Sequence, residues 1–315
     1  MPATGNVIRR ALLYIPGSSA RMLAKSQGLM LDCATYDLED SVTPALKPEA
    51  REKICSLLKG QRSPSVRENA VRINSLQSGL ALDDLTAVIH TPNLDTIVVP
   101  KINSAGDLRV VSEFMQHAIP ERQASASPVK LLALIESAKA IVDLSSICSS
   151  TPVLSGLIFA AEDFALDLSL TRTPSLNEFL FARSAVVTHC RAHELPSCVD
   201  LVCTSFRGQT GFQNLKEECL GGKELGFNGK QCIHPDQVET VQSLFAPSSD
   251  ELNWAMKIMI GDEKADQQGK GAWTMDGKMI DRPVVGKAKS IVERGNSCGI
   301  DVQALREKWK HQEPG

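Results

Sequence analysis

The sequence lacks long apolar runs and lacks a strong charge of either sign. None of its apolar stretches approaches the roughly 20 residues that cross a membrane as a helix. The formal net charge is only −3 over 315 residues, which gives no broad attraction to nucleic acid or to an anionic membrane. MPATGNVIRR is followed at once by ALLYIPG, which leaves no room for a signal peptide. We therefore expect no nucleic-acid partner and no membrane span.

Glycine-rich phosphate loops and paired-cysteine motifs are absent as well. Neither GxGxxG nor GxxxxGK[ST] occurs, so the common nucleotide-binding fingerprints are excluded. The nine cysteines form no CxxC pair, and several, such as Cys33 and Cys198, fall within apolar runs. Their odd number argues against a complete set of disulfides. We expect them to be small core residues of an intracellular protein in a reducing compartment.

Strand-like and helix-like segments alternate eight times along the chain. Short apolar runs, expected to be strands, lie at 11–15, 33–38, 70–74, 96–102, 131–135, 156–161, 198–204 and 227–234. Eight such units in about 245 residues are typical of a (β/α)₈ TIM barrel. We predict an α/β fold, with a catalytic barrel over 1–247 and a helical extension and lid over 248–315. An open doubly wound sheet is the alternative, weakened by the missing nucleotide loop.

Two acids directly follow neighbouring predicted strands. Glu136 comes after LLALI, and Asp163 comes after GLIFAA and Glu162. Parallel strands joined by a helix end at the same edge of a sheet, so the two acids would lie about 5 Å apart. Carboxylates that close repel one another unless a cation lies between them or one is protonated. Oxygen ligands suit Mg²⁺, and we predict a magnesium site at Glu136 and Asp163; two solvated loop acids are the alternative.

Further charged residues end the other predicted strands. Asp37 and Glu39 follow the second strand, Arg72 the third, Lys101 the fourth and His234 the eighth. Such charges are costly unless they are paired or meet a ligand, and their mixed signs indicate an anionic substrate held on a metal. A structural ring of salt bridges is the alternative.

Arg21 and Lys25 lie four residues apart, on one face of the first predicted helix. They would suit a phosphate clamp, although spacing alone favours a solvated helix face.

Seven motifs in order resemble those of the CitE-like acyl-CoA lyases, the group that includes the citrate lyase β subunit. They are YIPG (14–17), YDLEDSV (36–42), VRIN (71–74), VPK (99–101), the acid at 136, AEDF (161–164) and GKGAWTMDGKMIDRP (269–283). Each motif is weak by itself, but their shared order over nearly the whole chain is specific.

The resemblance implies a TIM barrel that uses Mg²⁺ and a CoA thioester. It implies metal ligation by Glu136 and Asp163, and Arg72 as a catalytic residue at the substrate. Asp281 would be the catalytic acid/base, on a lid that can reach a neighbouring subunit of a homotrimer. Contacts to CoA or to the acyl group are implied for Tyr14, Arg21, Lys25, Ile233 and His234, beside the rim residues Asp37 and Lys101. One departure is Ala160-Ala161, where relatives often have glycines; the methyl groups would narrow the substrate pocket.

Three functional hypotheses follow. The first is Mg²⁺-dependent cleavage of a 3-hydroxyacyl-CoA, such as (3S)-citramalyl-CoA, to acetyl-CoA and a 2-oxo acid; malyl-CoA and β-methylmalyl-CoA are alternative substrates. The second is hydrolysis or synthesis at the same site, as in a malyl-CoA thioesterase or a malate synthase. The third is a scaffold subunit without activity, which leaves the rim charges unexplained. If the protein is eukaryotic and a transit peptide has been removed, the resemblance places it in the mitochondrial matrix, and otherwise in the cytoplasm.

Overall fold

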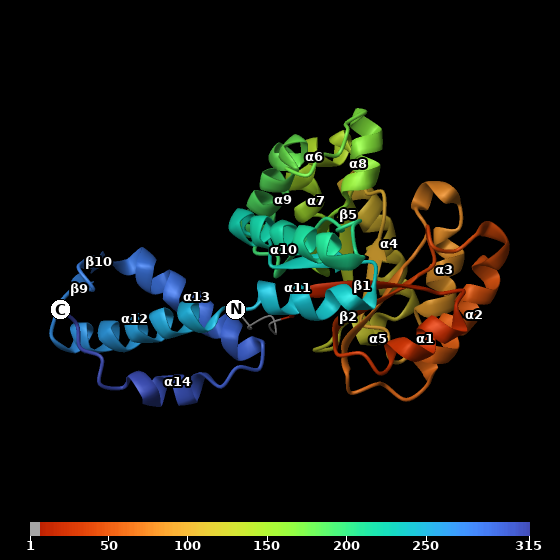
Figure 1. The fold of residues 1–315 in the computed structure, drawn as a ribbon. Coiled ribbons are helices and arrows are strands. Elements are labelled where there is room, and N and C mark those ends of the chain that lie inside the picture. Colours follow the sequence, from red (N-terminus) through yellow and green to blue (C-terminus); the bar gives the residue numbers. More distant parts are fainter. Residues whose placement is uncertain (1–6) are drawn as a thin grey trace. The chain divides into compact units, whose positions relative to one another are not determined.

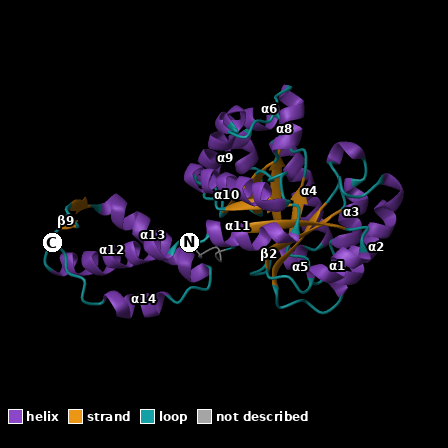
Figure 2. Ribbon diagram, in the orientation of Figure 1, coloured by secondary structure: helices purple, strands orange, loops and turns teal. Residues whose placement is uncertain are grey.

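A computed structural model describes residues 7–315. Within it, the chain divides into two compact units, one of Arg9–Gln242 and one formed mainly by Ser243–Gly315. Figures 1 and 2 show the strands and helices of both units. In the described residues, no helix is both long enough and apolar enough to cross a bilayer. All nine cysteines lie in the described part and are free thiols, seven of them buried.

The first unit is a closed barrel of parallel strands in the order β1 to β8, with β8 paired to β1. This confirms the predicted (β/α)₈ fold and excludes an open sheet. The strands are β1 Ala11–Pro16, β2 Leu31–Asp37, β3 Val66–Arg72, β4 Thr96–Val99, β5 Lys130–Ile135, β6 Leu154–Phe159, β7 Ser197–Asp200 and β8 Gly229–Cys232.

Helices connect consecutive strands and surround the barrel (Figure 1). They are α1 Ala20–Ser26, α2 Lys47–Lys59, α3 Ala81–Val88, α4 Ala105–Ala118, α5 Pro120–Gln123, α6 Ala138–Val142, α7 Leu144–Cys148, α8 Ala161–Leu168, α9 Leu180–Ala192, α10 Gly208–Leu225 and α11 Val238–Phe245. Short 3₁₀ turns lie at Pro44–Leu46, Leu76–Ser78, Asn177–Phe179 and Pro235–Gln237. Ser104 and Asp107 form the capping box of α4, as their spacing predicts. Such caps fix where each helix leaves its strand.

The barrel interior is filled by small and branched side chains. Leu12, Cys33, Ala70, Val98, Leu132, Leu134, Ile158 and Val199 form one buried cluster drawn from seven strands. Gly229 lies where β8 meets β1, and a Cβ there would come within 1.9 Å of the Arg9 carbonyl oxygen. The seam that closes the barrel therefore requires glycine at this position.

A buried ion pair lies near the amino-terminal ends of the strands. The Arg9 guanidinium donates to both carboxylate oxygens of Glu68, at 2.6 and 2.7 Å. It also donates to the hydroxyl oxygen of Ser155, at 2.9 Å, and Thr96 donates to Glu68. Every charge in this layer is thus paired by direct hydrogen bonds, which is the condition for burying charge without a large penalty.

The second unit is built from α12 Ser249–Gln267, the hairpin β9 Trp273–Met275 and β10 Lys278–Ile280, α13 Arg282–Ser297 and α14 Val302–Trp309. Its own core includes Met256, Trp273 and Ile280. The helices were expected, but the glycine-rich segment was predicted to be irregular and instead forms a hairpin. Asp276 and Gly277, at its turn, both have positive φ, at 51° and 73°, as a type I′ turn requires.

Arg9→Met should destabilise the barrel by about 3–5 kcal/mol, because it leaves the Glu68 carboxylate buried without its cation. The free energy of unfolding in urea measures this loss. Arg62→Met is the matched control, since Arg62 pairs with Asp95 at 2.7 Å but both side chains are about one-third exposed; its cost should stay within about 1 kcal/mol. Equal costs for the two variants would contradict a stabilising role for the buried layer.

Candidate active site

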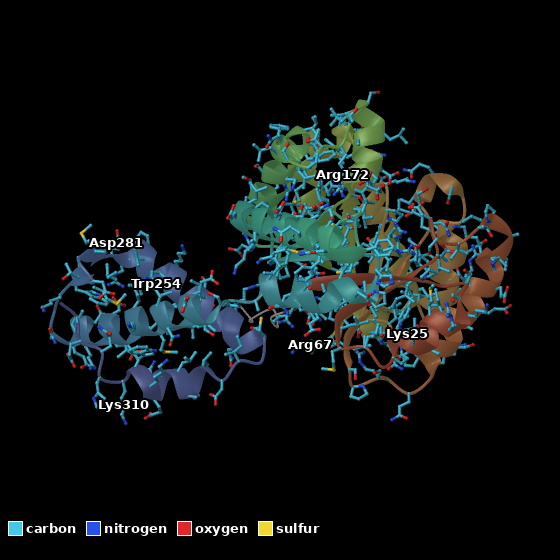
Figure 3. The ribbon with its side chains drawn as sticks, in the orientation of Figure 1. Lys25, Arg67, Arg172, Trp254, Asp281 and Lys310 are labelled. Carbon is cyan, nitrogen blue, oxygen red and sulfur yellow. The ribbon has the colours of Figure 1, made fainter. Side chains whose placement is uncertain are left out.

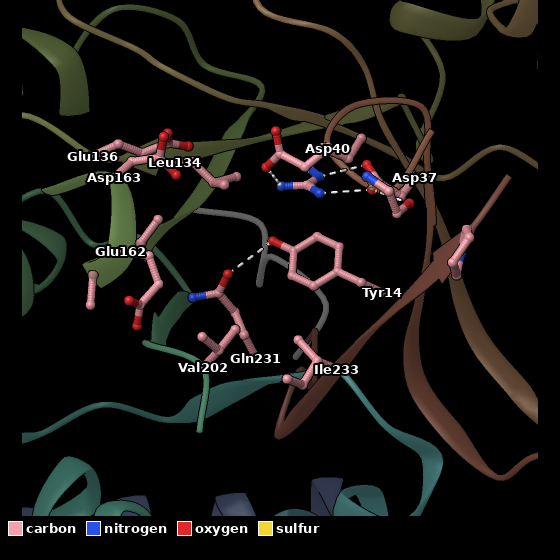
Figure 4. A pocket seen from close by; sticks show the side chains of 15 residues that line it. Tyr14, Asp37, Asp40, Leu134, Glu136, Glu162, Asp163, Val202, Gln231 and Ile233 are labelled. Carbon is pink, nitrogen blue, oxygen red and sulfur yellow. Dashed lines mark hydrogen bonds and ion pairs between the residues drawn. The ribbon is translucent and has the colours of Figure 1, made fainter. Parts of the chain in front are cut away.

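The carboxyl-terminal ends of the strands open into a cavity of about 390 Å³ (Figure 4). It is lined by Tyr14, Pro16, Asp37, Asp40, Ser41, Arg72, Leu134, Glu136, Ala160, Ala161, Glu162, Asp163, Val202, Gln231 and Ile233. Residues from most of the strand ends thus reach one space. This is where (β/α)₈ enzymes place their active sites.

Arg72, the last residue of β3, is held by a carboxylate fork. Its Nε and Nη2 donate to the two oxygens of Asp37 at 2.6 and 2.7 Å. Nη1 lies 3.0 Å from Glu39, and the guanidinium carbon lies 4.5 Å from the centre of the Tyr14 ring. Burial opposes ionisation of Asp37, but the Arg72 charge prevails and lowers the pKa of Asp37. Asp37 is therefore a charged support that fixes the direction of Arg72.

Glu136 directly follows β5, as predicted, and its side chain faces an excess of negative charge. It is only 5% exposed. Burial, followed by the charges of Glu39 and Asp163, raises the pKa of Glu136 to about 8. Burial also raises the pKa of Glu39 to about 7, against the attraction of Arg72. Three carboxylates therefore share this side of the cavity with too little positive charge nearby.

Lys101 lies between these acids. Its ammonium nitrogen is 3.5 Å from Glu39 and 3.5 Å from Asp163. Its backbone has a φ of 53°, a left-handed conformation that is uncommon for residues other than glycine. Backbone strain of this kind is often found at functional sites. The structure thus brings Lys101 to the cavity rim, where the sequence predicted it.

Asp163 lies where expected, but on a different element. The sixth strand was predicted to run through Ala161, whereas β6 ends at Phe159 and α8 begins at Ala161. Asp163 is thus in the first turn of α8, where the helix dipole favours a negative charge. Its neighbour Glu162 is turned to Arg172, which pairs with both Glu162 and Glu218. The pairing with Arg172, labelled in Figure 3, separates the roles of the two adjacent acids.

The donor set at Glu136 and Asp163 fits magnesium. Both side chains are carboxylates, both line the cavity, and the charge of Asp163 helps to raise the pKa of Glu136. No group of three or more His, Cys, Asp or Glu side chains among residues 7–315 is arranged to hold a metal ion. Two protein carboxylates, with water and substrate oxygens completing the shell, match the way Mg²⁺ is usually bound.

The sequence reasoning missed Gln231. This residue of β8 is 3% exposed, lines the cavity and accepts a hydrogen bond of 3.0 Å from the Tyr14 hydroxyl. A signal was available, because inward and outward residues alternate along a barrel strand. Gln231 is two residues before Ile233, on the face that was already expected to meet the ligand.

The remaining predicted residues are spread more widely. Ile233 lines the cavity. His234 is not among the lining residues; its ring stacks on Phe206 with centroids 4.9 Å apart. Arg21 and Lys25 lie on exposed positions of α1, likewise outside the described lining. Asp281 belongs to the second unit, where its side chain caps α13 by accepting from the Val284 amide at 3.2 Å (Figure 3).

Comparison with known proteins agrees with this fold and with the position of the cavity. A family model described as HpcH/HpaI aldolase/citrate lyase matches residues 10–235. The chain belongs to this family. The expected resemblance is thereby confirmed, and so is the prediction that the protein is an enzyme of the lyase class acting on a CoA ester.

Three relatives of this HpcH/HpaI chain have informative names. The citrate lyase subunit beta of Haemophilus influenzae is 35% identical over 92% of this chain and 98% of its own length. The mitochondrial citramalyl-CoA lyase of Mus musculus is 32% identical, covering 92% and 87%. The (3S)-malyl-CoA thioesterase of Cereibacter sphaeroides is also 32% identical, covering 91% and 97%.

A solved structure of CitE from Mycobacterium tuberculosis, in complex with magnesium, acetoacetate and coenzyme A, superposes with a TM-score of 0.72. It is 25% identical and covers 91% of this chain and 97% of its own.

Glu136→Gln should stabilise the metal-free protein at high pH. With a folded pKa of about 8, the folded state holds a proton that the unfolded state releases, so wild-type stability falls as the pH rises towards 8. Glutamine cannot ionise, and the variant should gain about 2 kcal/mol over wild type near pH 9 in chelator. The gain should vanish near pH 4, where both states of wild type are protonated.

Unfolding in urea at the two pH values measures this difference. Glu113→Gln, on the exposed face of α4, is the control and should show no such pH dependence. A gain that does not depend on pH would contradict the crowding of negative charge around Glu136.

Proposed function

We propose that the protein is a magnesium-dependent carbon–carbon lyase that cleaves a 3-hydroxyacyl-CoA, with (3S)-citramalyl-CoA as its substrate, to acetyl-CoA and pyruvate. One observation carries the proposal: Glu136 and Asp163 face the same cavity as Arg72 and crowd negative charge there. A relative at 32% identity named citramalyl-CoA lyase supports this choice of substrate.

Glu136 and Asp163 are the residues that would hold magnesium. A bound magnesium ion would supply Lewis-acid polarisation of the substrate hydroxyl and carboxylate. The magnesium in the related CitE structure and the excess negative charge at Glu136 both support this assignment.

Arg72 would stabilise the negative charge that develops on the thioester oxygen. In the reaction the substrate hydroxyl loses its proton, and the bond between the hydroxyl-bearing carbon and the adjacent methylene breaks. The electron pair remains as the enolate of acetyl-CoA. A guanidinium already fixed by Asp37 needs no reorientation when this charge appears, and such pre-organised donors contribute a few kcal/mol.

Asp281 would deliver the proton that converts the enolate carbon into the methyl group of acetyl-CoA. This assignment rests on the family resemblance, which implies that the lid of one subunit serves the site of another in a homotrimer. In this chain the Asp281 side chain already caps α13 through one oxygen, which would leave its second oxygen for proton transfer.

The other predicted ligand contacts are assigned as follows. Tyr14, Ile233 and the rim residues Asp37 and Lys101 would surround the acyl group and its thioester. Arg21, Lys25 and His234, away from the cavity lining, would serve the longer nucleotide end of CoA. Ala160 and Ala161 both line the cavity, where their methyl groups would limit the size of the keto-acid half. The mitochondrial name of the mouse relative supports the mitochondrial matrix as the location.

Hydrolysis of malyl-CoA is the second candidate, because a relative of equal identity is named (3S)-malyl-CoA thioesterase. The same acids and the same cation would serve both reactions. Only the bond that breaks differs, so product analysis separates the two. Cleavage or synthesis with malyl-CoA or β-methylmalyl-CoA, and a scaffold without activity, are decided by the same assay.

With citramalyl-, malyl- and β-methylmalyl-CoA offered separately with Mg²⁺, we expect citramalyl-CoA to give acetyl-CoA and pyruvate by mass spectrometry, and chelator to stop the reaction. Asp163→Asn should lower turnover by about 100-fold or more, because it removes a proposed metal ligand. Glu162→Gln, the adjacent cavity acid that pairs with Arg172, is the matched control and should lose less than about tenfold. Free CoA with an intact hydroxy acid would instead establish the thioesterase.

Asp281→Ala should reduce turnover by about 10²–10⁴-fold, the usual contribution of a general acid, while calorimetric Mg²⁺ binding stays unchanged. Asp301→Ala is the control, since Asp301 caps α14 in the same way, accepting from Gln303 and Ala304 amides at 3.1 and 3.0 Å. Both variants lose a helix cap worth about 1 kcal/mol, but only the first should lose turnover. Wild-type rates in Asp281→Ala would remove this residue from the mechanism.

A further inference from the structure

Gln231 makes three hydrogen bonds that together fix its orientation. Its amide nitrogen donates to the carbonyl oxygens of Phe159, at 2.8 Å, and Asp200, at 3.1 Å. Its amide oxygen lies 3.0 Å from the Tyr14 hydroxyl. The side chain therefore ties β8 to the ends of β6 and β7 while it faces Tyr14 on β1.

The two carbonyl partners decide which way the amide points. A carbonyl oxygen can only accept, so the group facing Phe159 and Asp200 must be the NH₂ of Gln231. The opposite orientation would leave two buried carbonyl oxygens facing a third oxygen, without a donor. The choice between amide oxygen and nitrogen, which is often ambiguous, is thus settled by the hydrogen-bond partners.

The orientation of Gln231 in turn decides the role of Tyr14. Because the Gln231 amide oxygen has no hydrogen, the single hydroxyl proton of Tyr14 must lie between the two residues. The phenol oxygen keeps its lone pairs, and Tyr14 lines the cavity. Burial raises the pKa of Tyr14 well above its usual value, so the hydroxyl keeps this proton.

We propose that Gln231 is a positioning residue that holds the Tyr14 hydroxyl as a hydrogen-bond acceptor towards the cavity, where it receives a hydrogen bond from a donor group of the bound thioester. This inference rests on the proposed function for the identity of the ligand. It makes Tyr14 a specificity-determining contact that cannot protonate the product, because its proton is committed to Gln231.

Two donors of an acyl-CoA could meet Tyr14, namely the 3-hydroxyl of the acyl group and an amide N–H of the pantetheine arm. The binding preference for the 3-hydroxy thioester over the same thioester without its hydroxyl separates them. If the hydroxyl is the donor, Tyr14→Phe should reduce this preference by about tenfold, because the deoxy ligand loses nothing. If a pantetheine amide is the donor, both affinities should fall together and the preference should persist. Unchanged affinity for both ligands would overturn the proposal.

The hydrogen bond itself can be tested without substrate. The chain has only two tyrosines, Tyr14 and Tyr36, so a Raman difference spectrum between wild type and Tyr14→Phe isolates the ring doublet of Tyr14. The intensity ratio of this doublet reports whether the hydroxyl donates or accepts. We expect a strong donor in wild type and loss of that signature in Gln231→Leu, whose side chain cannot accept. An unchanged doublet in Gln231→Leu would overturn the proposed polarity whatever the substrate proves to be.

A double-mutant cycle separates positioning from a merely structural role. Gln231→Leu should lower kcat/KM by about tenfold or more when residue 14 is tyrosine, and by less than about twofold in the Tyr14→Phe background. If Gln231 only braces β6, β7 and β8, both backgrounds should lose the same factor, and that result would contradict the proposal. Thermal unfolding of the four proteins checks that each remains folded. The Raman result does not depend on turnover, so failure of the proposed reaction cannot be mistaken for failure of this inference.

Discussion

The crowding of carboxylates in one partly enclosed cavity is the constraint around which the active site is arranged. Glu39, Glu136 and Asp163 meet there, and burial makes each uncompensated charge costly. Lys101 reaches two of the three, and Arg72 meets Glu39 but is largely taken up by Asp37. The site therefore favours any ligand that brings a divalent cation. The raised pKa of Glu136 expresses that unmet demand.

The two ends of the barrel treat buried charge in opposite ways. Near the amino-terminal ends of the strands, Arg9 and Glu68 satisfy one another through paired hydrogen bonds. At the carboxyl-terminal ends, the acids outnumber the cations that contact them, and Lys101 has a left-handed backbone. The first arrangement stabilises the fold, whereas the second gives up stability to keep a site open for a metal and a substrate. This separation of stabilising and functional ends is characteristic of the (β/α)₈ architecture.

Local chemistry explains which features of the fold were predictable. Continuous apolar runs such as LLALI predict strands covered on both faces, and the capping box at Ser104 and Asp107 predicts where α4 begins. The end of the sixth strand was misplaced, because Ala160 and Ala161 suit a strand as well as the start of α8. The hairpin at 273–280 was missed although Asp276-Gly277 is a strong turn signal; its three-residue strands were too short to show an alternating pattern.

The sequence by itself determined the barrel, the family and the acids that follow the strands, because strand periodicity and chain order are local properties. Only the tertiary structure decided how those side chains are paired: Arg72 with Asp37, Glu162 with Arg172, and Tyr14 with Gln231. Each pair joins residues from different strands or loops, and closure of the barrel determines which of them meet. The direction of the Tyr14 hydrogen bond depends on the carbonyl oxygens of two further strands. No local pattern contains that information, because it arises only when four strand ends converge on one side chain.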